Sequence, residues 1–149
     1  MTVVYEIESK NKDDAIKEII SRAEVFDCIC DKDKFVESVF FRETEGACVG
    51  HGVAFSHGRI HEVSEMKIAL GISRTGISCD APDGRPVHLL FVLATNPAMY
   101  EDHLDRLSIL AKMARREHFR SEILSCFGQK EAEEKLKETY TLCSEKQAV

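Results

Sequence analysis

The chain has 149 residues, a length that suits one ordinary domain. Hydrophobic residues make up 44% and charged residues 31% of the sequence, which predicts a globular fold rather than a disordered chain. A formal net charge of -6 excludes a general binder of nucleic acid or of anionic membranes, because both need a positive field. The absence of Trp argues against a base-stacking surface.

No apolar run approaches the roughly 20 residues that a bilayer-spanning helix needs. The N-terminal stretch reaches Glu6 and Glu8 too early for a signal peptide, so we expect a cytoplasmic protein without direct membrane insertion. The cysteines are scattered without a CxxC pair, which in a reducing compartment predicts neither a disulfide framework nor a cysteine-type zinc site. We expect the cysteines to act mostly as small apolar residues that fill space in the core. The six cysteines are Cys28, Cys30, Cys48, Cys79, Cys126 and Cys143.

In the first third of the chain, the pattern predicts a strand over 3–7 and then a helix capped by Asn11. The apolar residues of this helix recur at helical spacing. They are Ala15, Ile16, Ile19, Ile20 and Ala23. A second, shorter helix is predicted around 35–40. The following stretch, 43–58, holds four of the eight glycines and is predicted to be a loop with a short strand at 53–55.

The remainder predicts a strand over 66–72, a turn at 81–86 and an interior strand over 87–94, whose apolar run is almost continuous. Three helices follow: one after Asn96 and Pro97, one over 119–126 and one over 130–142. Helices at both ends and strands in the middle indicate an α/β fold, a three-layer α/β/α sandwich with a mixed sheet. We expect a single domain over 1–149, with 144–149 as a frayed tail.

The chemistry-bearing segment holds three histidines, His51, His57 and His61, within eleven residues. Imidazole titrates near neutral pH and can act as nucleophile, base or metal ligand. The histidine spacing matches no common zinc pattern, so a metal-dependent hydrolase is only an alternative. The sequence holds no P-loop, no complete dinucleotide fingerprint and no HExxH motif. A role with phosphate would therefore place the phosphoryl group on a side chain.

The residues around His57 resemble a known family. Arg42-Glu43, a glycine-rich stretch and then the run from Gly52 to Gly58 are similar to the active-site signature of the fructose/mannitol-type EIIA domain. This is a phosphocarrier domain of the bacterial phosphoenolpyruvate-dependent phosphotransferase system. The segments 83–91 and 103–111 also resemble the family's central turn and strand and the start of its His-Leu helix. The resemblance covers most of the chain and implies a sheet of about five strands.

The resemblance also implies residue roles. His57 would accept the phosphoryl group from a phosphohistidine of an HPr-like carrier, Arg42 would hold phosphate oxygens, and His103 would be the second active-site histidine. A phosphate loop would complete the site. Its residues would be Gly50, Gly52, Ser56 and Gly58. Phosphoryl transfer between two imidazoles depends mainly on positioning and cationic stabilisation, so we expect no metal and no cofactor.

The family has two branches, in which the next partner is either a sugar-transport EIIB or a regulatory protein target. The chain has no fused EIIB-, EIIC- or HPr-like segment, and this favours the free-standing nitrogen-regulatory branch. A stand-alone subunit of a fructose/mannitol-type transporter is an alternative. A second alternative is an interaction module without phosphotransfer, because Ser56 replaces the usual Pro and Ala47 the usual Thr.

Overall fold

The computed structural model describes residues 1–43, 48–79 and 81–147, without the side chains of 42, 43, 48, 49, 146 and 147. Within these residues, one five-stranded sheet has the order β1-β4-β5-β3-β2. The strands are β1 (Thr2–Val4), β2 (Cys48–Gly50), β3 (Val53–Arg59), β4 (Lys67–Ile77) and β5 (Val87–Thr95). β1 runs parallel to β4 and β3 parallel to β5, whereas β4–β5 and β2–β3 are antiparallel. The predicted mixed sheet is confirmed.

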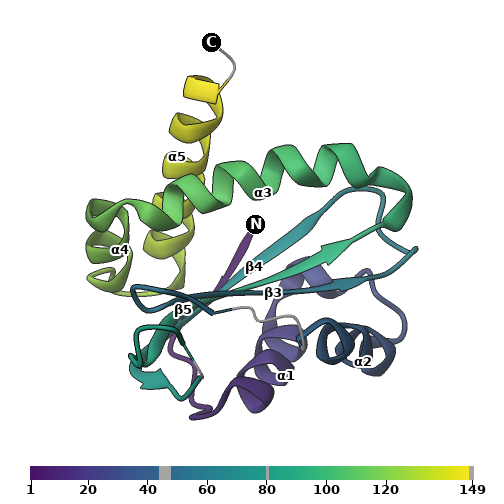
Figure 1. Cartoon of the computed structure of the whole chain (residues 1–149), viewed down its shortest axis with the longest axis horizontal. Helices are drawn as coiled ribbons and strands as arrows, with labels where there is room; N and C mark the ends of the chain where they lie inside the picture. The colour runs from purple at the N-terminus through teal and green to yellow at the C-terminus, as the bar shows by residue number, and fades with distance from the viewer. Residues whose placement is uncertain (44–47, 80, 148–149) are drawn as a thin grey trace.

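Helices cover both faces of the sheet, as the α/β/α prediction requires (Figure 1). One layer holds α1 (Lys12–Arg22) and α2 (Lys32–Glu43), with the short 3-10 helix Glu24–Phe26 between them. The other holds α3 (Tyr100–Arg115), α4 (Glu117–Leu124) and α5 (Gln129–Gln147), and the 3-10 helix Pro97–Met99 precedes α3. Helix α5 continues past residue 142, so residues 144–147 are helical rather than the frayed tail we expected.

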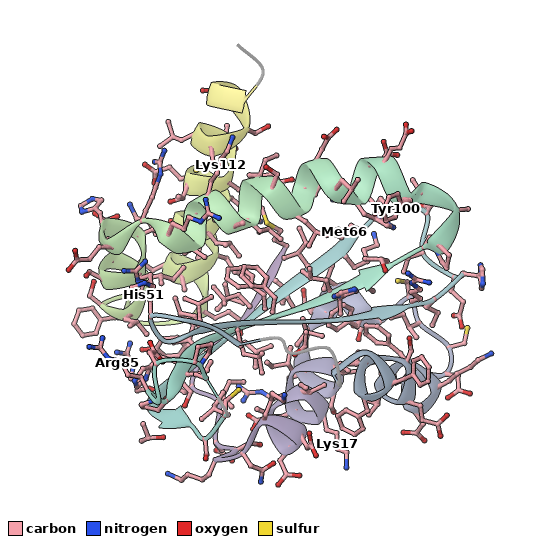
Figure 2. All side chains as sticks on the ribbon, viewed as in Figure 1. Lys17, His51, Met66, Arg85, Tyr100 and Lys112 are labelled. Carbon is pink, nitrogen blue, oxygen red and sulfur yellow. The ribbon has the colours of Figure 1, made fainter. Side chains whose placement is uncertain are left out.

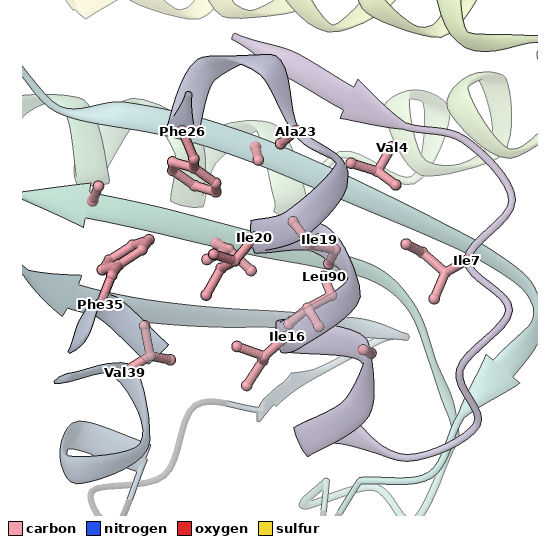
Figure 3. Close-up of a cluster of buried hydrophobic side chains, with 14 of the residues drawn as sticks. Val4, Ile7, Ile16, Ile19, Ile20, Ala23, Phe26, Phe35, Val39 and Leu90 are labelled. Atoms are coloured by element: carbon pink, nitrogen blue, oxygen red, sulfur yellow. The ribbon is translucent and has the colours of Figure 1, made fainter. Parts of the chain in front are cut away.

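Each face of the sheet has its own apolar core, because successive residues of a strand point to opposite faces. On the side of α1 and α2, Ile16, Ile19 and Ile20 pack toward sheet residues such as Leu90 (Figure 3). On the side of α3, α4 and α5, the odd-numbered neighbours Leu89, Phe91 and Leu93 are buried instead. β5 is therefore covered on both faces, which explains its almost continuous apolar sequence.

The region predicted as a glycine loop contains more strand than expected. β2 and β3 form a hairpin in which Gly50 pairs with Val53, so the connection has only two residues. Those residues, His51 and Gly52, have φ of 56° and 77°. Positive φ at both positions is the geometry of a type I′ turn, whose twist matches that of the paired strands. The prediction that β3 ends at residue 55 is wrong, since the strand runs on to Arg59.

The cysteines only partly follow the expectation. Cys126 and Cys143 are free and buried in the core beside α5, as apolar fillers would be, whereas Cys28 and Cys30 are free and exposed. Cys79 is disulfide-bonded, against the prediction that the cysteines form no disulfides. Scattered cysteines in the sequence gave no sign of this bond, because only the tertiary fold brings distant thiols together. None of the helices within the described ranges has the combination of length and apolar character that a membrane crossing demands.

Candidate functional site

Strand β3 determines which way the predicted nucleophile points. Side chains alternate along a strand, and Phe55 belongs to the core under α3, while Ala54 belongs to the core under α1 and α2. His57 therefore lies on the face covered by α3, where it is half-buried. Arg59, two residues further on, has the same orientation and is exposed. His57 and Arg59 thus point to the same side of the sheet.

These two side chains open onto a cavity of about 180 Å³ at the carboxyl ends of the parallel strands β3 and β5. The first two turns of α3 form its other wall. The cavity is lined by His57, Arg59, Thr95, Pro97, Tyr100, His103, Leu104 and Leu107. The structure therefore brings the predicted pair His57 and His103 to one cavity, although they are far apart in the sequence. Carboxyl ends of parallel strands are the usual place for ligand sites in α/β folds.

The chain segment that links β5 to α3 holds the His103 side chain in place. It is only 6% exposed, and its Nε2 atom lies 2.8 Å from both the backbone nitrogen and the backbone oxygen of Asn96. The Asn96 N–H group needs a lone pair on Nε2, whereas the Asn96 carbonyl needs a proton there. Either neutral tautomer of His103 therefore finds a partner at Asn96, and Nδ1 is left without a hydrogen bond to any described residue.

The floor of the cavity is held by Thr95 and Asn96. The Thr95 hydroxyl donates to the carbonyl oxygen of Gly58 at 3.1 Å, which ties the ends of β5 and β3 together. The Asn96 side chain donates to the carbonyl of Val63 at 3.0 Å and accepts from the backbone N–H of Ala98 at 2.9 Å. Because these bonds join both strands to the start of α3, the two histidines sit on a rigid support.

The predicted phosphate loop is not assembled around His57. Gly50 and Gly52 belong to the β2–β3 turn, and along β3 Gly52 precedes His57 by about 16 Å at roughly 3.3 Å per residue. In Figure 2, His51 of this turn and Tyr100 of the cavity lie at opposite ends of the molecule. The turn is instead bound by Asp83, whose Oδ2 atom accepts from the His51 backbone N–H at 2.8 Å. This bond, and a weaker one from the Arg85 backbone, lower the pKa of Asp83.

Ser56 and Gly58 flank His57 in the chain but face the opposite side of the sheet. Ser56 is buried, and its hydroxyl makes no hydrogen bond within the described part of the chain. A Cβ atom on Gly58 would lie 2.8 Å from Phe35 and from Val39 of α2, so glycine lets the helix approach the strand. The Ser56 hydroxyl therefore does not face a group held by His57, and Gly58 has no side chain to offer one.

Two further expectations fall wholly or partly on residues that the structure does not describe. Arg42 belongs to α2, but its side chain is outside the described part, so its role as a phosphate ligand stays a prediction. Ala47 is outside the described residues as a whole.

The structure separates the histidines of the alternative zinc site. His51 lies in the turn before β3, His57 lies near the carboxyl end of β3, and His61 is exposed in the loop after β3. Over residues 1–43, 48–79 and 81–147, no cluster of three His, Cys, Asp or Glu side chains is placed to hold a metal ion. His88 Nδ1 donates a hydrogen bond to the carbonyl oxygen of Ser73 at 2.8 Å.

Arg59 and Tyr100 are cavity residues that the sequence reasoning missed. The signal for Arg59 was its position two residues after His57, which puts it on the same face of any strand that includes both. It was overlooked because β3 was predicted to end at residue 55. Tyr100 carries no such signal, since its place depends on where α3 crosses the sheet.

Residues 1–139 match the sequence profile of the family described as phosphoenolpyruvate-dependent sugar phosphotransferase system, EIIA 2. The chain belongs to this EIIA family. A fructose-specific EIIA component from Haloferax volcanii is 30% identical over 128 residues, which cover 85% of this chain and 83% of that protein. A fructose-specific EIIABC component from Bacillus subtilis is 31% identical over 83% of this chain, which spans only 20% of that longer protein.

Among solved structures, the nitrogen regulatory protein IIA-Ntr from Neisseria meningitidis superimposes with a TM-score of 0.77 at 29% identity. The superposition covers 93% of this chain and 92% of that one. This EIIA chain is thus similar both to sugar-specific and to nitrogen-regulatory members of its family, over nearly its full length.

Proposed function

We propose that this EIIA protein is a phosphocarrier that accepts a phosphoryl group on His57 from the phosphohistidine of an HPr-like protein. The observation that carries the proposal is the shared cavity of His57 and His103, in a chain of the EIIA family. A nitrogen lone pair of His57 forms the new N–P bond while the N–P bond of the donor breaks, and the electron pair of the broken bond returns to the donor ring. No metal or cofactor takes part, because both the donor and the acceptor are imidazoles.

The surroundings of His57 support transfer between proteins. Tyr100 and Leu104 are exposed apolar side chains at the mouth of the cavity, and Pro97 beside them is also exposed. Exposed apolar groups around a reactive side chain are typical of a docking surface. A partner that covers this rim excludes water from the phosphoryl group in transit, which limits hydrolysis.

We place the protein in the nitrogen-regulatory branch, where its phosphorylation state would control binding to regulatory protein targets in the cytoplasm. Its likeness to the Neisseria meningitidis regulatory protein over most of both chains supports this. The alternative is a fructose/mannitol-type transport subunit that passes phosphate to EIIB, which the Haloferax volcanii relative supports. We further propose that residues 1–149 form a single domain, in keeping with the one sheet that joins the strands of the described residues.

The test is phosphorylation by radiolabelled, phosphorylated HPr-like protein. We expect the unchanged protein and a His61→Ala control to be labelled, because His61 is exposed and does not line the cavity. His57→Ala is expected to remain unlabelled while unfolding at the same urea concentration, because a half-buried polar side chain contributes little packing. Labelling of His57→Ala would contradict the assignment of the nucleophile. Absence of label from the unchanged protein would favour the interaction module without phosphotransfer.

The two branches are separated by the next step. A fructose-type EIIB protein added to the labelled EIIA protein removes the label if this chain is a transport subunit. Retention of the label in the presence of EIIB supports the regulatory branch.

A further inference from the structure

Arg59 is placed where a phosphoryl group on His57 would need a cation. The two residues share a face of β3, and their Cα atoms are about 6.6 Å apart at roughly 3.3 Å per residue. Both line the same cavity. The side chain of Arg is long enough to bring its guanidinium group over the imidazole of His57 from this position.

The backbone of Arg59 is held at both of its polar groups. Its N–H donates to the hydroxyl oxygen of Ser38 at 2.8 Å, and the same hydroxyl donates to its carbonyl oxygen at 3.2 Å. Ser38 lies on α2, which covers the other face of the sheet. The end of β3 is thereby fixed to a helix, and the Arg59 side chain starts from a defined point although it is exposed.

Among the described residues, the guanidinium group of Arg59 has no bonding partner. It forms no ion pair and no hydrogen bond with any of the described residues, unlike Arg22, which pairs with Glu18, and Arg106, which contacts Glu65. None of the described residues that line the cavity is acidic. In a chain with a net charge of -6, an arginine that lies beside the nucleophile and pairs with no carboxylate of the described residues is available for an anion that arrives from outside.

Phosphoryl transfer needs a cationic side chain beside the nucleophile. During the reaction, negative charge is spread over the three equatorial oxygens, and the guanidinium fork donates two parallel N–H bonds to oxygens of this kind. A lysine supplies the charge but not the planar fork. We propose that Arg59 binds the phosphoryl oxygens during transfer to His57 and in the phosphorylated protein, as a catalytic residue in its own right. This proposal rests on the proposed function of His57.

The test compares Arg59→Gln and Arg59→Lys with Arg85→Gln, using radiolabelled, phosphorylated HPr-like protein as the donor. Arg85 is also exposed, but it lies beside His51 at the end of the molecule opposite Tyr100 (Figure 2). We expect Arg59→Gln to lower the rate at saturating donor about 100-fold, as loss of one transition-state donor does. Arg59→Lys should recover part of the rate, and Arg85→Gln should react within about twofold of the unchanged protein.

Two readouts separate binding of the phosphoryl group from a structural or docking role. A contact with the group in transit lowers the rate at saturating donor, whereas a docking contact raises only the donor concentration needed for half-maximal rate. Urea unfolding of Arg59→Gln should match that of the unchanged protein, since the side chain is exposed. A rate for Arg59→Gln equal to that of the unchanged protein overturns this proposal alone. Absence of label from the unchanged protein overturns the proposed function, and this proposal with it.

Discussion

The packing of Gly58 between the site and α2 makes a quantitative prediction. In Gly58→Ala, the new Cβ atom would lie 2.8 Å from Phe35 Cε1, 2.8 Å from Val39 Cγ2 and 3.0 Å from Phe35 Cδ1. Carbon atoms in contact prefer about 3.5–4.0 Å, so α2 has to retreat by roughly 0.7–1.2 Å or the two side chains have to leave their rotamers. Both Phe35 and Val39 are fully buried, which leaves them no free space.

Overpacking of this kind costs about 1–3 kcal/mol of unfolding free energy. For a chain of this size that lowers the melting temperature by about 2–4 °C per kcal/mol. Urea denaturation followed by far-ultraviolet circular dichroism gives the free energy directly, and an unchanged slope with urea shows that the folded state itself was destabilised. We expect the midpoint to fall and the slope to stay the same.

A second variant tests whether the clash is the cause. Val39→Ala removes one of the two contact partners, so the cost of Gly58→Ala in that background should fall by about 1 kcal/mol. Gly84→Ala is the control, because Gly84 has a φ of +69° but no atom of the described residues within 4 Å of its Cβ position. Its cost comes only from the backbone and should not change with Val39→Ala. Additive costs for Gly58→Ala and Val39→Ala, or a cost of Gly58→Ala below about 0.5 kcal/mol, would refute the reasoning.

Two further predictions concern buried or bonded polar groups. Burial alone would raise the pKa of Glu18, but hydrogen bonds from Ser9, Glu8 and Arg22 outweigh it and lower the pKa. The stabilisation that these hydrogen bonds give the fold is therefore complete above the ordinary glutamate pKa. It is lost as the pH falls through the lowered pKa of Glu18. Glu18→Gln should cost about 2 kcal/mol at pH 7 and almost nothing in acid, by urea titration at each pH. An equal cost of Glu18→Gln at pH 7 and in acid would contradict this prediction. Ser56→Ala should stabilise the fold by about 1 kcal/mol in the same assay, because the substitution removes a buried hydroxyl that has no hydrogen-bond partner among the described residues. Destabilisation would show that the hydroxyl is hydrogen-bonded.

The elements that the sequence predicted well are those with a strong apolar period. Ile16, Ile19 and Ile20 recur at helical spacing and do form the buried stripe of α1. The apolar run of 87–94 predicted an interior strand, and β5 is buried on both faces. The region around His57 was predicted less well, because its glycines suggest a loop by composition alone. In the structure one pair of positive φ angles makes a tight hairpin, and the rest of the segment continues as strand.

The sequence by itself determined the family and the α/β sandwich and predicted His57 and His103 as the site histidines, because all of these depend on residue types at fixed spacing along the chain. The tertiary structure decided which groups surround His57. Strand alternation turns Arg59 toward the cavity and Ser56 and Gly58 away from it, and the length of β3 removes Gly50 and Gly52 to its far end. His103 meets His57 only because α3 folds back over the sheet after Asn96. Spacing along a chain fixes local structure, whereas the approach of distant side chains depends on strand register and helix packing, which no short motif contains.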